Sequence, residues 1–156
     1  MTIRPNGKGT EKIVVRELRK AYGIHVDIQR LTDKSDTGNY EDVRPSDFIV
    51  LLGRKLAQEK GLPQIFYVEA KETTKSGKSI SINSMFRKGQ IQAMKRSIPL
   101  GIPYFVVIQF LDTKEVCIIP CTFIVETLAA GAKSLSVAEI KKHPWTTGEL
   151  HDYFIA

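Results

Sequence analysis

The chain has 156 residues, 42% of them hydrophobic, which is the size and composition of one globular domain and excludes an intrinsically disordered chain. No apolar run is long enough to span a bilayer, and the first residues lack the apolar segment of a signal peptide, so we expect a cytoplasmic protein with no membrane partner. The formal net charge of +6 is compatible with a nucleic-acid partner, and an excess of basic residues lies between positions 71 and 96.

The first part of the chain is predicted to form one helix and two strands. Thr10 can cap the helix, Glu11 lies in its first turn, where the helix dipole favours an acid, and Gly23 can end it. The alternation of apolar and polar residues predicts the strands, and Gly, Asn and Asp predict a polar loop between them. The expected elements are a helix at 10–22, a strand at 24–31, a loop at 32–44, a strand at 45–53 and a connector at 54–63 with at most one helical turn.

The second part of the chain is predicted to alternate strands with helices. Asn83 or Ser84 can cap the first of these helices, and Pro99 lies beyond its end. The expected elements are strands at 64–71, 102–111 and 115–120, a loop at 72–81, helices at 83–98 and 121–131, and a tail at 132–156 whose end could add an edge strand. This order predicts a single α/β domain over residues 1–156, with a central mixed β-sheet flanked by helices.

Two consecutive hydrophobic strands each carry a carboxylate. In FYVEAKET, at 66–73, Phe66, Val68 and Ala70 alternate with Tyr67, Glu69 and Lys71, so Glu69 and Lys71 share one face of the strand. Asp47 lies on the preceding strand, and consecutive strands usually lie side by side. If Asp47 faces the same way, two carboxylates and a lysine converge.

Such a set of residues suits metal-dependent phosphodiester hydrolysis. Asp47 and Glu69 offer the hard oxygen ligands that Mg²⁺ or Mn²⁺ prefers, and Lys71 can stabilise a negatively charged phosphorus centre. An exposed Glu–Lys ion pair of little energetic consequence explains the same residues equally well. The residue pattern alone leaves both interpretations open.

Three stretches carry a family resemblance: PSDFIVLL at 45–52, FYVEAKET, and KGQIQAMKRSIPLGIPYFVVIQF at 88–110. Over residues 44–110 the chain resembles the nuclease core of the RecU family of Holliday junction resolvases, which belong to the PD-(D/E)xK nuclease superfamily. The resemblance implies a restriction-endonuclease-like nuclease core. The loop at 32–44 is shorter than the family's projecting stalk and the segment at 53–62 is longer than its hairpin, which predicts a compact, divergent member of viral or archaeal type.

The resemblance also implies which residues form the site. The family's catalytic residues fall on Glu11, Asp47, Glu69, Lys71 and Gln90, with Asp47 and Glu69 as the ligands of Mg²⁺, for which Mn²⁺ is expected to substitute. Glu17 is a rival to Glu11 as the acid of the first helix, because the helical register is open. The residues predicted to contact DNA are Lys75, Lys78, Arg87, Lys88, Lys95 and Arg96.

The expected function is therefore a structure-selective DNA endonuclease that resolves four-way junctions as a homodimer. Two alternatives remain open at this point. One is a nuclease of the same superfamily that acts on other DNA substrates, because loops rather than the shared site select the substrate. The other is a protein that binds junctions without cutting them.

Overall fold

The structure, a computed structural model, describes residues 8–32, 44–74 and 77–150. Within them, five strands form one sheet in the order β1-β2-β3-β5-β6, in which β3 and β5 are parallel and the other neighbours antiparallel. These strands are β1 (Val26–Arg30), β2 (Phe48–Leu52), β3 (Ile65–Thr73), β5 (Tyr104–Phe110) and β6 (Val116–Pro120). The short strands β4 (Ser79–Ser81) and β7 (Ser134–Ser136) pair with each other.

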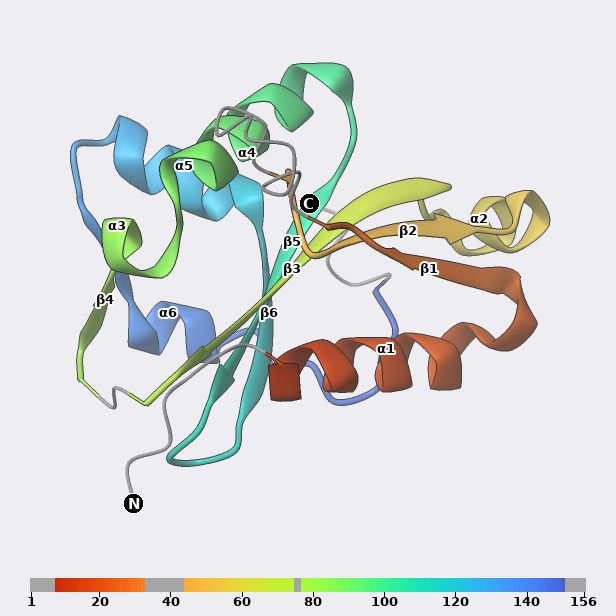
Figure 1. Cartoon of the computed structure of the whole chain (residues 1–156), viewed down its shortest axis with the longest axis horizontal. Coiled ribbons are helices and arrows are strands. Elements are labelled where there is room, and N and C mark those ends of the chain that lie inside the picture. Colours follow the sequence, from red (N-terminus) through yellow and green to blue (C-terminus); the bar gives the residue numbers. More distant parts are fainter. Residues whose placement is uncertain (1–7, 33–43, 75–76, 151–156) are drawn as a thin grey trace.

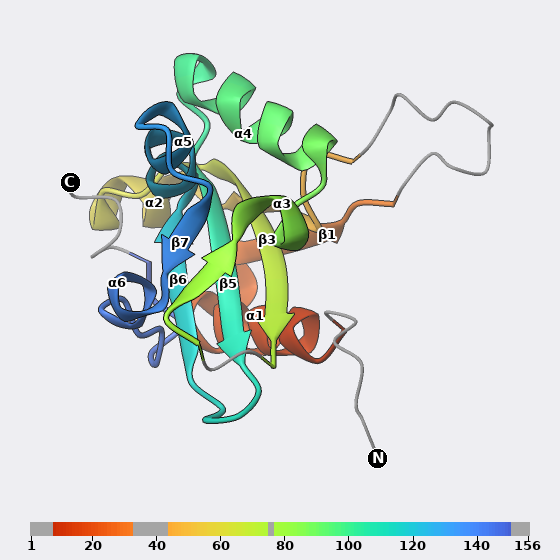
Figure 2. The same cartoon turned by 90° about the vertical axis from the view of Figure 1, so that its left-hand side faces the viewer.

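Helices cover both faces of the sheet (Figure 1). One face packs against α1, and the other against α4 and α5 (Figure 2). The helices of the described residues are α1 (Lys8–Tyr22), α2 (Arg54–Lys60), α3 (Ile82–Met85), α4 (Lys88–Leu100), α5 (Cys121–Ala129) and α6 (Val137–Lys141), with a 3-10 turn η1 (Gly23–His25) after α1. The predicted α/β fold with a central mixed sheet flanked by helices is confirmed, and it is compatible with a nuclease-like core.

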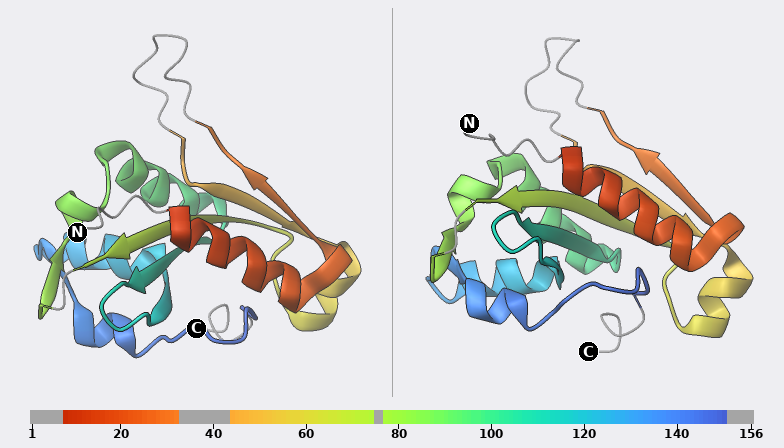
Figure 3. Two further views of the ribbon diagram at one scale, coloured as in Figure 1. Left: turned by 60° about the horizontal axis from the view of Figure 1, so that its bottom comes forward. Right: turned by 90° about the horizontal axis from the view of Figure 1, so that it is seen from below.

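The hydrophobic patterns explain why these elements pack as they do. Val14, Leu18 and Tyr22 recur at four-residue spacing along α1 and are all buried against the sheet. Figure 3 shows α1 lying across this face. The central strand β5 is buried along almost its whole length, as expected for a strand covered on both faces. Cys117 and Cys121 are buried free thiols.

The predicted helix at 83–98 is wrong in one respect, because the chain breaks it into α3 and α4. Phe86 has an extended backbone (φ −120°, ψ 139°) that turns its side chain into the core, where it is 3% exposed. A second helix must then begin, and Gln90 accepts a hydrogen bond from the backbone N–H of Arg87 at 3.0 Å, as the third residue of a helix does in a capping box. Asn83 and Ser84 lie inside α3 and cap neither helix.

Other boundaries also differ from the predictions. The connector after β2 holds the seven-residue helix α2, which Gly61 ends in a left-handed conformation (φ 65°). The predicted loop at 72–81 contains the end of β3 and all of β4, and the tail contains β7 and α6. Pro99 lies within the last turn of α4 rather than beyond the end of the helix. The helix ends one residue later, so the missing N–H of the proline does not break a longer helix. The predicted edge strand at the C-terminus falls on 151–156, outside the described residues.

Across the described part of the chain, no helix combines the length and the apolar character needed to cross a bilayer.

Gly148 makes the tightest glycine contact in the described fold and supplies a stability test. A Cβ at this position would lie 2.3 Å from the backbone oxygen of Glu17, and its φ of 73° already disfavours an L side chain. We expect Gly148→Ala to lower the free energy of unfolding by about 2 kcal/mol or more, measured by urea denaturation. Gly131→Ala is the matched control, because Gly131 has a positive φ of 89° but no atom within 4 Å of its Cβ position. Equal losses for the two variants would contradict the steric argument.

Candidate active site

The site forms where two paired strands separate. Pairing between β2 and β3 runs from Leu51↔Ile65 to Phe48↔Val68, whereas pairing between β3 and β5 continues to Thr73↔Phe110. From Glu69 onward, β3 is therefore still paired with β5 but no longer with β2. An interior strand edge that loses its partner exposes backbone groups that need another partner.

Asp47 satisfies one of these backbone groups. It immediately precedes β2, and its Oδ2 accepts a hydrogen bond from the backbone N–H of Ala70 at 2.7 Å. Its other oxygen, Oδ1, lies 2.8 Å from the guanidinium of Arg44. Asp47 is only 3% exposed, so both contacts are formed away from bulk water, where charge-assisted hydrogen bonds are strong. The pair of contacts fixes the Asp47 carboxylate beside the stretch of β3 that β2 no longer pairs.

Glu69, Lys71 and Gln90 form one connected polar network. Glu69 Oε1 accepts a hydrogen bond from Gln90 Nε2 at 2.9 Å and lies 3.4 Å from Lys71 Nζ. Lys71 donates to Gln90 Oε1 at 3.3 Å, the same oxygen that accepts the Arg87 N–H. Gln90 thus uses one amide to cap α4 and to orient the side chains of Glu69 and Lys71 on β3.

No group among the described residues donates a hydrogen bond to the second oxygen of Glu69. Glu69 is 1% exposed, and its Oε2 is buried. An unpartnered carboxylate oxygen away from water is costly, so its presence points to a ligand that would complete it. Glu72 Oε1 on the same strand is likewise buried without a hydrogen bond.

The structure distinguishes between the two candidate acids of α1. Glu11 lines the same cavity as Asp47 and Glu69, and its Oε2 pairs with Arg30 at 3.2 Å. Glu17 pairs with the exposed Arg16 at 3.2 Å and is not part of the cavity lining. Glu11 is therefore the helix acid that meets the other predicted site residues.

Burial, together with the crowding of the carboxylates, raises the pKa of Glu11 and of Glu69. Burial first, and then the nearby Asp47 charge, raises the pKa of Glu69 from its ordinary value of 4.5 to about 8, although Lys71 opposes the shift. Burial and Asp47 also raise the pKa of Glu11. Carboxylates in this arrangement favour either a proton or an added cation.

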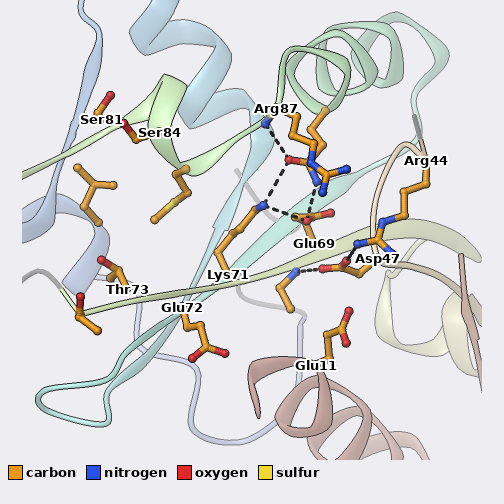
Figure 4. Close-up of a pocket in the computed structure, with 15 residues that line it drawn as sticks. Glu11, Arg44, Asp47, Glu69, Lys71, Glu72, Thr73, Ser81, Ser84 and Arg87 are labelled. Atoms are coloured by element: carbon orange, nitrogen blue, oxygen red, sulfur yellow. Dashed lines mark hydrogen bonds and ion pairs between the residues drawn. The ribbon is translucent and has the colours of Figure 1, made fainter. Parts of the chain in front are cut away.

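The cavity that these groups share has a volume of about 430 Å³. Figure 4 shows Glu11, Asp47 and Glu69 entering it from α1, from the start of β2 and from β3. The cavity is also lined by residues with hydroxyl groups, which are Thr73, Thr74, Ser81 and Ser84. Since one liquid water occupies about 30 Å³, the cavity has room for a hydrated ion together with a phosphate group.

The predicted DNA-binding residues are only partly near this cavity. Arg87 lines it from the residue before α4. The exposed side chains of Lys78, Lys88, Lys95 and Arg96 are not among the described residues of its lining. Lys75 lies outside the described residues.

Arg44 is a cavity residue that the sequence did not single out. It lies at the end of the polar segment after β1, donates to the Leu31 carbonyl at 3.3 Å and pairs with Asp47. Its positive charge also lowers the pKa of Glu11 and of Glu69, against the larger raising effects. The only signal in the sequence was its position three residues before Asp47.

The donor set fits a hard divalent cation, although the described residues include no preformed cluster of three or more His, Cys, Asp and Glu side chains that could hold one. Asp47 and Glu69 supply carboxylate oxygens, and the orphaned Glu69 Oε2 is free to coordinate. Coordination by Asp47 Oδ1 would have to displace Arg44. The site could thus hold Mg²⁺ after a small rearrangement.

Comparison with known proteins adds no relative to this description. No protein-family model matches the chain, and no curated protein is significantly similar to it.

The raised pKa of Glu69 predicts a pH-dependent stability in the absence of divalent cations. Between pH 4.5 and about pH 8 the folded state holds a proton that the unfolded state has lost, so the free energy of unfolding should fall as the pH rises. Urea denaturation in EDTA should show this fall in the wild type and a smaller fall in Glu69→Gln. Glu17→Gln, outside the cavity, should retain the wild-type profile. Parallel profiles for the wild type and Glu69→Gln would contradict the assignment.

Proposed function

We propose that this protein is a metal-dependent DNA endonuclease that cuts four-way junctions. The observation that carries the proposal is the convergence of Asp47, Glu69 and Lys71 in one cavity at the point where β2 and β3 separate. The residues whose roles rest on the resemblance to RecU resolvases, Glu11 and Gln90, line the same cavity. A surface ion pair does not account for this arrangement, because Glu69 is 1% exposed and one of its oxygens is unpartnered.

Asp47 and Glu69 are the residues that would hold Mg²⁺, and Mn²⁺ is expected to substitute. A bound ion of this kind makes a water molecule easier to deprotonate and stabilises charge on a phosphoryl oxygen. The positive charge of the ion would also offset the repulsion between the carboxylates, which contributes to the raised pKa values of Glu11 and Glu69.

The chain's own side chains then act on the phosphate. The Lys71 ammonium faces the cavity with a side chain 22% exposed, which suits it to stabilise the extra negative charge on the phosphate as the transition state forms. Gln90 holds Lys71 and Glu69 in register through its amide. Glu11, which lines the cavity and whose pKa is raised, is the proposed acceptor of a proton from the attacking water.

A four-way junction is the proposed substrate because of the resemblance over residues 44–110 together with the basic surface. The formal net charge of +6 favours a polyanionic partner. The intact set of acids and lysine supports cutting rather than binding alone.

The site assignment predicts variants that bind DNA without cutting it. Asp47→Asn and Glu69→Gln should abolish cleavage of a four-way junction in Mg²⁺, and Lys71→Ala should slow it by about 10²- to 10³-fold. Binding should persist in Asp47→Asn and Glu69→Gln, because the carboxylates do not hold the DNA. Glu17→Gln is the control and should cut normally. A near wild-type rate for Glu69→Gln would sink the assignment.

The same variants distinguish a loss of metal binding from a loss of catalysis. Mg²⁺ should raise the melting temperature of the wild type, because a ligand that binds the folded state stabilises it, and should not raise that of Glu69→Gln. Cleavage of a linear duplex and of a flap, measured beside the junction, tests the substrate: equal rates on all three would replace junction resolution with a broader nuclease activity.

We further propose that the working unit is a homodimer. A junction is resolved by two symmetric cuts, whereas the described residues of one chain contain one set of Asp47, Glu69 and Lys71. A two-fold dimer would supply two sets and would match the symmetry of the substrate. Mixed dimers of wild-type and Lys71→Ala chains, given a cruciform in a closed circle, should yield nicked circles instead of linear DNA. Analytical ultracentrifugation at micromolar concentration gives the stoichiometry. A strict monomer that still makes paired cuts would overturn the dimer.

A further inference from the structure

A second groove adjoins the candidate site on the side of α1. It has a volume of about 730 Å³, larger than the site cavity, and Glu11 lines both. Five cationic residues line the groove, namely Lys8, Lys12, Arg16 and Arg19 from α1 and Arg30 from β1. Of these, Arg16 pairs with Glu17 and Arg30 with Glu11.

The basic residues of α1 form a continuous stripe. Lys8, Lys12 and Arg16 are four residues apart and Arg19 follows after three, which places them on one face of the helix. At about 1.5 Å per residue, the stripe is about 16 Å long. Lys12, Arg16 and Arg19 are exposed, and Arg30 enters from the neighbouring strand to pair with Glu11 at the end of the groove nearest the site.

The first half of this stripe works against the stability of α1, whereas Arg19 lies in the last turn, where a cation is favoured. Lys8 begins α1, where the helix dipole disfavours a positive charge. Lys12 is flanked at four-residue spacing by two further cations, and like charges at this spacing repel. A bound polyanion would remove both penalties.

We propose that this groove holds the phosphate backbone of one DNA strand as it leaves the active-site cavity, an inference that rests on the proposed nuclease function. A strand carries one phosphate per about 3.4 Å of duplex axis, so the stripe matches about five nucleotides. Phe48 supplies the aromatic ring in the described lining, but it is 3% exposed and cannot stack on bases. The groove therefore recognises the backbone and not the sequence.

Continuity with the cavity favours DNA over an acidic protein as the occupant. Glu11 belongs to both surfaces, so a strand whose phosphate lies at Lys71 can continue directly along α1. The predicted DNA contacts at Arg87 and on α4 lie on the other side of the cavity, as Figure 4 shows for Arg87 and Glu11. The DNA would thus be held on both sides of the cut.

The test uses Glu69→Gln as a non-cutting parent and measures junction binding by fluorescence anisotropy at several salt concentrations. Adding Lys12→Ala and Arg16→Ala should weaken binding and reduce the magnitude of the log–log salt slope by about 1.8, which is about 0.9 for each phosphate that the variant no longer neutralises. The matched control adds Arg54→Ala and Lys55→Ala, which remove the same charge from exposed positions on α2. The control slope should match that of the parent. Equal slopes for the groove and control variants would overturn the proposal.

Neutral phosphates locate the contact. Single methylphosphonates placed within about five nucleotides on one side of the cut should weaken binding to the parent and have little effect on the Lys12→Ala, Arg16→Ala variant. If both proteins show the same drop in affinity at each position, the groove does not hold the strand, and an acidic protein partner becomes the better explanation. Circular dichroism should show that α1 stays folded in the variant.

The two proposals fail in different ways. A wild-type protein that does not cut DNA in Mg²⁺, but whose salt slope depends on Lys12 and Arg16, would refute the nuclease function and support the groove as a nucleic-acid surface. A wild-type protein that cuts junctions with a salt slope independent of these residues would refute only the groove.

Discussion

The hydrogen bond from the Ala70 N–H to Asp47 Oδ2, at 2.7 Å, is the contact on which the rest of the site depends. It replaces a ladder bond at the position where β2 stops pairing with β3, so the separation of the strands leaves no unsatisfied donor there. The same contact fixes a carboxylate next to Glu69 and brings Arg44 with it. The same hydrogen bond therefore both completes the sheet where β2 and β3 separate and positions the Asp47 carboxylate in the candidate site.

The site is built at the expense of stability. Glu11, Asp47 and Glu69 crowd into a region from which Glu69 is almost completely removed from water, and the raised pKa values of Glu11 and Glu69 reflect first their burial and then the repulsion from Asp47. Residues selected only for folding would not be placed in this way. Gln90 limits the cost, because it caps α4 with the same amide that holds Glu69 and Lys71. The helix break at Phe86, which looks like an irregularity, is what places Gln90 at the start of a helix facing β3.

Period-two alternation was sufficient to predict β3 and the shared face of Glu69 and Lys71, because strand geometry fixes both. The motif itself carried little information: Glu139 and Lys141 repeat the E-x-K spacing on α6, where each forms an ordinary surface ion pair, with Lys142 and Glu115. The two E-x-K motifs differ in their surroundings, because Glu69 is buried on strand β3. Neither the break at Phe86 nor the role of Arg44 could be predicted, since both depend on tertiary contacts rather than on local pattern.

The two basic surfaces beside the cavity differ in how visible they are in the sequence. Between residues 71 and 96, basic residues outnumber acidic ones so strongly that counting charges along the sequence is enough to identify this surface. Along α1, Glu11 and Glu17 are interspersed among the cations, and the same count underestimates the stripe. Helical geometry orders them in space: Glu11 lies at the junction of the cavity and the groove, Glu17 pairs with Arg16, and Lys12, Arg16 and Arg19 line the groove alone. A carboxylate cluster with cations on both sides can attract a phosphate backbone that its own charge would otherwise repel, and under the proposed function this requirement accounts for the cations that follow Glu11 along α1.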